Sequence, residues 1–365
     1  MKQMFLALLL LPVVAQPPSR RVASPRIVAL LEGARIAVIN SADGSTLAER
    51  SLGDTSRWTS GWTLGVSPSG ANVFVALVAR SEKETAVVRF DLTDYSVHQV
   101  AVLADSIAYP FLAVGQRSGR VFLGSEWGFR IAIVDPRTPA NIVRYASGRD
   151  TMAFGPAFWF DVSASEARIY TSYHGGGNPT VEGGFRGGAG VDWIDISKSP
   201  FEPCKGSKMQ LVGTRFPTTV GFGCGSAHGR MVPYGDGFVA ASGGPMLHVY
   251  DSATVEIGSF RIGLGPRNHV MEFAVDSVKR VAYPIGPCEG AGGVNRVAIS
   301  NPANAETAFA PLSTVCGERI VLSQDRRTAA VSSRDGFALF DIETGTTDRR
   351  VKLSAGIRDL AFVRD

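Results

Sequence analysis

The feature that most constrains this fold is the recurrence of two short strand patterns along nearly the whole chain. The first is an apolar strand, a polar turn and a second apolar strand, and it occurs at 64–76, 160–170, 273–283 and 320–331. The second is a strand ending in Asp or Asn, a turn and a more polar strand, and it occurs at 36–44, 88–94, 131–135, 193–195, 247–251 and 339–345. Short apolar runs bounded by Gly, Asp, Ser and Pro are typical of strands and turns rather than of helices.

One pattern of each kind makes a four-stranded antiparallel sheet of roughly 45 residues, a length typical of propeller repeats. Such a sheet cannot bury both of its faces alone, so we expect the units to stack radially into a β-propeller. Full units are predicted at about 63–104, 109–148, 156–215, 227–263, 268–312 and 317–353.

Two incomplete pieces remain at the ends of the chain. Residues 26–53 hold only three strands, and Arg358–Arg364 is a lone first-strand sequence. Joined, they make a seventh blade, and this closure removes two sheet edges that would otherwise be free to pair. The predicted fold is therefore all-β: a single seven-bladed β-propeller domain over 26–365, closed by a C-terminal strand that joins the N-terminal blade.

The Asp or Asn that ends a strand recurs from unit to unit, so we interpret it as scaffold rather than as acidic catalysis. At this position a carboxylate or amide oxygen accepts N–H groups of the following turn, which is an Asx-type turn.

Segments 52–75 and 337–345 resemble the YVTN-type seven-bladed propeller superfamily, which includes lactonase-like and amine-dehydrogenase heavy-chain-like proteins. In such propellers ligands usually meet one face, built from loops that join second to third strands and one blade to the next. We call this the loop-rich face. The resemblance to amine-dehydrogenase heavy chains implies at most a scaffold role, since their quinone cofactor belongs to a separate light subunit, and no cofactor is predicted.

The first residues read as an export signal. Lys2 is followed by the apolar stretch Met4–Ala15, which predicts a signal peptide over 1–15 cut before Gln16, then a linker over 16–25. No segment is long and apolar enough for a transmembrane anchor. We expect a secreted or periplasmic protein.

Export makes disulfides the expected state of the four cysteines. Three connectivities are possible. We favour Cys204–Cys224 and Cys288–Cys316 because short loops make neighbouring pairings the easiest to form.

The charges exclude one class of partner and the glycines mark one insertion. The net charge of +4 is spread without a basic run, which argues against nucleic-acid binding.

Of the 41 glycines, eight lie in the insertion 172–190, where His174, Glu182 and Arg186 are the only ionisable residues. This insertion is either a flexible hairpin or a ligand-binding loop.

The loop-rich face gathers most of the irregular residues. Besides the insertion these are Trp58, Trp127, 218–229, 266–269, 287–294 and Arg334-Asp335, and the predicted ligand-binding residues are His174, Glu182, Arg186, His228, Trp127, Glu289 and Arg334. His174, His228 and His269 fall on connections of this face but lack ligand spacing, so no metal site is predicted. Packing or solvent exposure explains His98 and His248.

Residues 263–273 resemble the Gly-Pro-Arg-His-x-x-Phe signature of the lactonase-like propellers. The resemblance implies that Arg267 binds an acidic group of the substrate and that His269 activates water or polarises the lactone, assisted by Glu272 or Glu289. The sequence departs from the signature by the inserted Asn268, and it lacks the family's histidine motif near the second blade. An ordinary inter-blade turn is the alternative interpretation.

The preferred function is an exported β-propeller that binds a partner protein or small ligand through the loop-rich face, without catalysis of its own, as a monomer or a subunit of a larger complex. One alternative is a lactonase-like hydrolase using Arg267 and His269. Another is the non-catalytic propeller subunit of a periplasmic dehydrogenase.

Overall fold

The computed structural model describes residues 25–363 except 105–109, 126–129, 147–156, 174–177, 180–184, 187–189, 196–230, 236, 242–245, 252–255, 262–271, 286–292, 301–308 and 334. The described residues form strands and turns and contain no helix. Accordingly, they include no helix that could cross a membrane.

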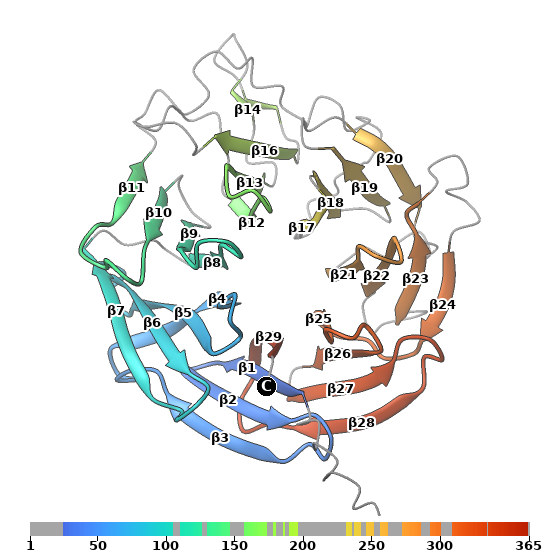
Figure 1. Cartoon of the computed structure of the whole chain (residues 1–365), viewed down its shortest axis with the longest axis horizontal. Coiled ribbons are helices and arrows are strands. Elements are labelled where there is room, and N and C mark those ends of the chain that lie inside the picture. Colours follow the sequence, from blue (N-terminus) through green and yellow to red (C-terminus); the bar gives the residue numbers. More distant parts are fainter. Residues whose placement is uncertain are drawn as a thin grey trace, which may run out of the picture.

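Six four-stranded antiparallel sheets are arranged around a central axis as the blades of a β-propeller (Figure 1). The N-terminal half contains β1 (Arg26–Leu31), β2 (Arg35–Asn40) and β3 (Thr46–Ser51), then β4 (Trp58–Val66), β5 (Asn72–Ala79), β6 (Thr85–Asp91) and β7 (Val97–Leu103), then β8 (Pro110–Val114), β9 (Val121–Ser125), β10 (Arg130–Val134) and β11 (Val143–Ala146). The C-terminal half contains β17 (Met231–Tyr234), β18 (Gly237–Ala241), β19 (Met246–Tyr250) and β20 (Glu256–Arg261), then β21 (Glu272–Asp276), β22 (Val281–Ile285), β23 (Val294–Ala298) and β24 (Phe309–Ser313), then β25 (Arg319–Leu322), β26 (Thr328–Ser333), β27 (Gly336–Asp341), β28 (Thr347–Lys352) and β29 (Ile357–Val363).

The prediction of seven four-stranded blades was wrong for the unit expected over 156–215, and the described residues form six four-stranded blades. Here a sheet of three strands forms, with β12 (Ala157–Val162), β13 (Arg168–Tyr173) and β16 (Gly190–Asp195). Between β13 and β16 the chain makes a separate pair of two-residue strands, β14 (Asn178–Pro179) and β15 (Phe185–Arg186). The glycine-rich insertion interrupts the repeat, and 196–215, from which a fourth strand was expected, lie outside the described residues. The inner strand β12 contacts β8 on one side and β17 on the other, so this sheet stands in the ring with the six blades.

The ring closes through strands from both ends of the chain. The C-terminal β29 pairs antiparallel with β1, and the sheet order is β29-β1-β2-β3. This is the closure predicted from the two incomplete pieces. It lets β29 contact β4 and β25, the inner strands of the two neighbouring blades.

Each blade is apolar on both faces because it is packed between two others. On β1, Val28 and Leu30 join a cluster with β4 and β5 of the next blade. The alternate residues Ile27, Ala29 and Leu31 join a cluster with β26 and β27 of the preceding blade. Since strand side chains alternate between faces, a strand buried on both faces reads as a continuous apolar run.

The Asx-type turns predicted at strand ends are confirmed at four described positions. The side-chain oxygen of Asn40, Asp91, Asp135 or Asp341 accepts a backbone N–H two residues ahead, at 2.8–2.9 Å. At Asp341, hydrogen bonds from the backbone and hydroxyl of Thr344 and from the backbone of Glu343 lower the carboxyl pKa. These acids therefore stabilise turns.

Glu166 joins two neighbouring sheets. Its carboxylate oxygen accepts the backbone N–H groups of Arg117 and Ser118, in the turn between β8 and β9 of the preceding sheet, at 2.6 and 2.8 Å. Burial acts to raise the pKa of Glu166, but the hydrogen bonds from Ser118 and Arg117, with the charge of Arg120, outweigh it and lower the pKa below 4.5.

We expect Glu166→Gln to destabilise the protein by about 1–1.5 kcal/mol at pH 7, because the N–H groups of Arg117 and Ser118 then bond a neutral amide oxygen in place of a charged carboxylate oxygen. The depressed folded-state pKa makes this stabilisation fully present above pH 4.5 and lost as the pH falls through the folded value. Urea unfolding at pH 7 and under acid conditions measures the difference. The control Glu84→Gln removes an exposed ion pair with Arg57 and should have a small effect. A Glu166→Gln deficit that is unchanged in acid would contradict the assignment.

Candidate functional site

Most of the site residues predicted from sequence lie outside the described residues. These are Trp127, His174, Glu182, His228, Arg267, His269, Glu289 and Arg334. Arg186 lies in the short strand β15, and Glu272 is the first residue of β21. The roles given to all of these residues stay predictions.

Trp58, His98 and His248, also singled out in the sequence, lie among the described residues. Trp58 is buried in the core between blades. His248 is fully buried in β19, near the ring of Tyr250, and the exposed His98 lies 2.8 Å from the Ser96 hydroxyl.

Cys316 is the one described cysteine, and it is disulfide-bonded. Cys204, Cys224 and Cys288 lie outside the described residues, so the pairing stays a prediction.

A pocket of about 250 Å³ opens at the loop-rich face, between the closing blade and the blade that begins with β4. It lies where β4 begins, where β5 turns into β6 and where β29 begins, all of which are connections of that face. The lining residues are Thr59, Ser60, Trp62, Val78, Ala79, Arg80, Glu82 and Arg358.

An irregularity in β4 shapes one wall of this pocket. Ser60 pairs with Leu77 and Leu64 pairs with Val75, so three residues of β4 stand opposite one residue of β5. A bulge of this kind re-aims side chains at the edge of a sheet. Gly61 is required there, because a Cβ would lie 2.7 Å from the carbonyl oxygen of Pro110 in the next blade. The repeat alone predicted a first strand from about residue 63, because the bulge breaks the apolar alternation, whereas β4 begins at Trp58.

The pocket brings together a stacked pair from opposite ends of the chain. The Arg358 guanidinium lies over the Trp62 ring, 4.7 Å from its centroid, and an Nη of Arg358 is 3.4 Å from the Glu32 carboxylate. Cation–π stacking fixes the plane of a guanidinium without using its N–H donors.

Arg80 also lines the pocket. Its Nε donates to the carbonyl oxygen of Thr55 at 3.2 Å, and its backbone N–H donates to the carbonyl oxygen of Arg57 at 2.8 Å. Glu82, two residues later, is exposed and has φ 56° in the turn between β5 and β6. The pocket thus holds two guanidiniums and one carboxylate.

Beside the pocket, an ionic chain links three consecutive inner strands. Glu272 of β21 pairs with Arg319 of β25 at 2.8 Å, and Arg319 Nε lies 3.9 Å from Asp359 of β29. The other Asp359 oxygen accepts the backbone N–H of Leu64 in β4 at 2.9 Å. Burial lowers the pKa of Arg319, partly opposed by the charges of Asp359 and Glu318.

The ionic chain bears on the role predicted for Glu272, which is to assist Arg267 and His269 in hydrolysis. Its side chain is 1 % exposed and ion-paired, which makes it part of the wall that joins the blades. A carboxylate held in this way is poorly placed to assist a base.

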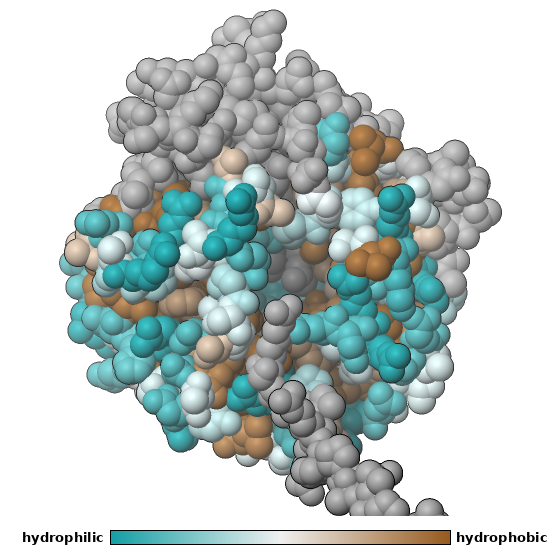
Figure 2. All heavy atoms as spheres, viewed as in Figure 1, coloured by the Kyte–Doolittle hydropathy of each residue, from teal (hydrophilic) through white to brown (hydrophobic). Residues whose placement is uncertain are grey.

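The central channel is the larger hollow, with a volume of about 580 Å³ (Figure 2). Among the described residues that line it, the only ionisable ones are Asp161 and Asp359. The Asp359 carboxylate is occupied by Leu64 and Arg319. Among the described residues, the channel lining therefore has fewer ionisable groups than the lining of the pocket.

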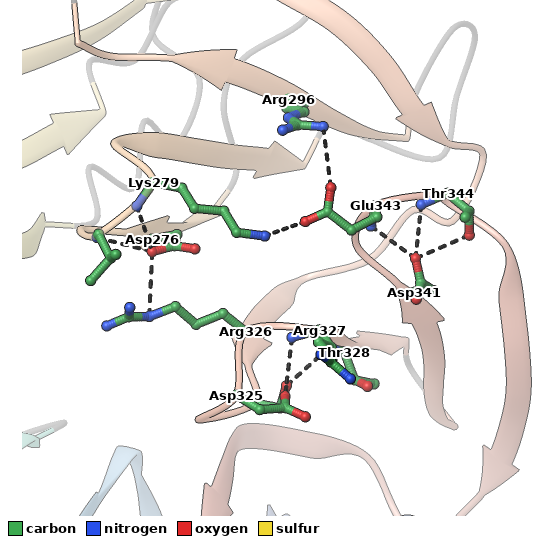
Figure 3. Close-up of polar contacts among 12 residues, drawn as sticks. Asp276, Lys279, Arg296, Asp325, Arg326, Arg327, Thr328, Asp341, Glu343 and Thr344 are labelled. Atoms are coloured by element: carbon green, nitrogen blue, oxygen red, sulfur yellow. Dashed lines mark hydrogen bonds and ion pairs between the residues drawn. The ribbon is translucent and has the colours of Figure 1, made fainter.

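On the opposite face, formed by the turns between first and second and between third and fourth strands, several charged residues of two neighbouring blades are paired (Figure 3). Asp276 accepts the backbone N–H groups of Val278 and Lys279 and lies 3.3 Å from Arg326 of the next blade. Glu343 pairs with Lys279 and lies 3.8 Å from Arg296. These contacts fasten β21–β24 to β25–β28, and we interpret them as structural.

Sequence reasoning missed Trp62, Arg80, Glu82 and Arg358 as site residues. One signal was available: Trp58 and Trp62 flank a glycine in one strand, and β4, with nine residues, is the longest inner strand described. No local signal marks Arg358, since its partners come from the other end of the chain.

Neither a protein-family model nor a curated protein matches the chain by sequence. Solved structures show the fold. A candidate 6-phosphogluconolactonase from Bacteroides uniformis is 11% identical with a TM-score of 0.65, over 93% of this chain and 100% of that one. AztD from Citrobacter koseri is 13% identical with a TM-score of 0.56, over 93% and 98% of the two chains. The dihydro-heme d1 dehydrogenase NirN is 13% identical with a TM-score of 0.53, over 96% and 78%. At these identities the likeness establishes a β-propeller and leaves the function open.

Proposed function

We propose that this protein is a binding β-propeller that takes up a small ligand at its loop-rich face, in the pocket between the closing blade and the β4 blade. The observation that carries the proposal is the Arg358–Trp62 stack in the wall of a concave pocket on that face. Ligand sites are typically concave, with an apolar lining and a few placed polar groups.

The chemistry of the pocket favours binding over catalysis. Its ionisable lining residues are Arg80, Arg358 and the exposed Glu82. Guanidiniums stay protonated in proteins and serve recognition rather than proton transfer. The scaffold is rigid, since its blades are packed on both faces, and connections on a rigid scaffold are where binding residues are commonly found.

The proposal is tested by screening a small-molecule library for thermal stabilisation of the purified chain. We expect hits whose affinity falls at least tenfold in Trp62→Leu and is unchanged in Lys279→Ala, a variant of the opposite face. Circular dichroism and the Tm without ligand establish that both variants fold. Hits that bind Trp62→Leu as tightly as the wild type would place the site elsewhere, and a library without hits would argue against small-ligand binding.

A lactone hydrolase is the second candidate. The observation that favours it is that β21, directly after Arg267 and His269 in sequence, begins at the loop-rich end of the channel. Lactone hydrolysis by the wild type that is lost in His269→Ala would support it, and activity unchanged in that variant would remove the assigned role.

Export is proposed on the N-terminal pattern of Lys2 and Met4–Ala15. Mass spectrometry of the protein from its native host should find a mature chain that begins at Gln16. A chain that retains Met4–Ala15 would refute cleavage there.

A further inference from the structure

The charged residues that line the pocket at the loop-rich face select among ligands. They are two arginines, Arg80 and Arg358, and one glutamate, Glu82, while Glu32, outside the lining, pairs with Arg358. We propose that the pocket binds a small monocarboxylic acid whose carboxylate lies between Arg80 and Arg358. This inference rests on the proposed function and specifies its ligand class.

Arg80 is held in place while its donors stay available. Its backbone N–H donates to the carbonyl oxygen of Arg57, and its Nε donates to that of Thr55. Both acceptors lie in the connection between β3 and β4. Among the described residues nothing bonds its two terminal nitrogens, and the side chain is exposed. A guanidinium with two free N–H groups on one edge fits the two oxygens of a carboxylate.

Arg358 offers a second guanidinium that can be recruited. Its guanidinium lies 4.7 Å from the centroid of the Trp62 ring, and among the described residues its one carboxylate contact is with Glu32, at 3.4 Å. The Glu32 side chain is 57% exposed. Ion pairs with such exposure contribute little to stability, so a ligand carboxylate can replace Glu32 or share Arg358 with it at small cost.

The remaining lining sets the size and the charge of the ligand. The buried side chains of Val78 and Ala79 offer apolar contact. The volume of about 250 Å³ lies below the roughly 300–1,000 Å³ of sites for drug-sized ligands, which favours a small molecule. Glu82 on the same pocket repels a second negative charge, which disfavours dicarboxylates and phosphate.

The experiment is calorimetric titration of the full chain at low salt with benzoate, phenylacetate and butyrate. Each acid is matched with its neutral amide, and inorganic phosphate and succinate are added as dianionic probes. We expect saturable binding of at least one monocarboxylate, with the amide and both dianions at least tenfold weaker. Added salt should weaken the binding, since the charges are partly exposed.

Variants locate the site. Arg80→Gln should weaken carboxylate binding about tenfold or more, because the side chain loses its charge and its paired N–H donors. Since this side chain is exposed, we expect the fold to stay unchanged. Arg358→Gln should act in the same direction, and Lys279→Gln on the opposite face should change nothing. If Arg358→Gln reduces the stability of the fold, the Arg80→Gln variant alone tests whether the carboxylate binds in this pocket.

Three results would overturn the inference: no binding of any monocarboxylate, binding that Arg80→Gln leaves unchanged, or phosphate or succinate binding as tightly as the acids. These are distinguishable from failure of the proposed function. A neutral or cationic library hit whose binding is lost in Trp62→Leu keeps the pocket as a ligand site while refuting the carboxylate.

Discussion

A chain that ends at Gly356 should lose its cooperative thermal transition. The truncation removes β29, whose buried side chains Ile357, Leu360, Phe362 and Val363 pack between the first and last blades. At about 1.5–3 kcal/mol for each buried side chain the loss is roughly 6–12 kcal/mol, comparable with the total stability of a typical domain, about 5–15 kcal/mol. The backbone edge of β1 is also left without its partner.

The matched control is a chain that ends at Val363, which keeps β29 complete. It should unfold with the midpoint of the full chain in thermal and urea denaturation. A chain ending at Gly356 with an unchanged Tm would refute closure by the C-terminal strand.

The second large effect is expected at Arg319, the centre of the ionic chain. Arg319→Met leaves the Glu272 and Asp359 carboxylates buried without their shared cation. Removing one partner of a buried pair typically costs about 3–5 kcal/mol. We expect a Tm lower by on the order of 6–10 °C, measured by thermal denaturation.

Two controls separate this effect from ordinary loss of an ion pair. Arg137→Met removes an exposed arginine, paired with Asp135 at 2.7 Å, and should cost no more than about 1 kcal/mol. Combining Arg319→Met with Glu272→Gln and Asp359→Asn removes the two buried carboxylate charges and should recover much of the lost stability. A combined variant no more stable than Arg319→Met would contradict the buried-charge explanation.

The closing strand and the strand-end acids were predictable because their signals are local. The pattern of Arg358–Arg364 is that of a first strand with no blade of its own, and β29 covers Ile357–Val363. The acid at Asp341 bonds N–H groups two and three residues ahead, a distance that the sequence itself specifies. Such features depend on backbone geometry within a few residues.

The repeat prediction was wrong where local pattern and neighbouring structure disagree. At 156–215 the described sheet has three strands, and β14 and β15 form a separate pair between the second and the third of them. At β4 the bulge adds residues that the alternation does not anticipate, because its cause is the close approach of Gly61 to Pro110 of another blade.

In the candidate pocket, too, some features follow from the local sequence and others only from which blades are neighbours. Its tryptophan could be noticed in the sequence, but the stacking of Trp62 on Arg358 requires the C-terminal strand β29 to lie beside β4. Arg319, Glu272 and Asp359 likewise come from three different inner strands.

By itself, the sequence determined that this chain is built from repeated antiparallel strands closed into a propeller by its own C-terminus, because alternation, turns and strand ends act over a few residues. Only the tertiary structure decided which charges share a pocket, which are buried against each other and where β4 bulges. Ring closure brings side chains from opposite ends of the chain within a few ångströms, and no local pattern records that proximity.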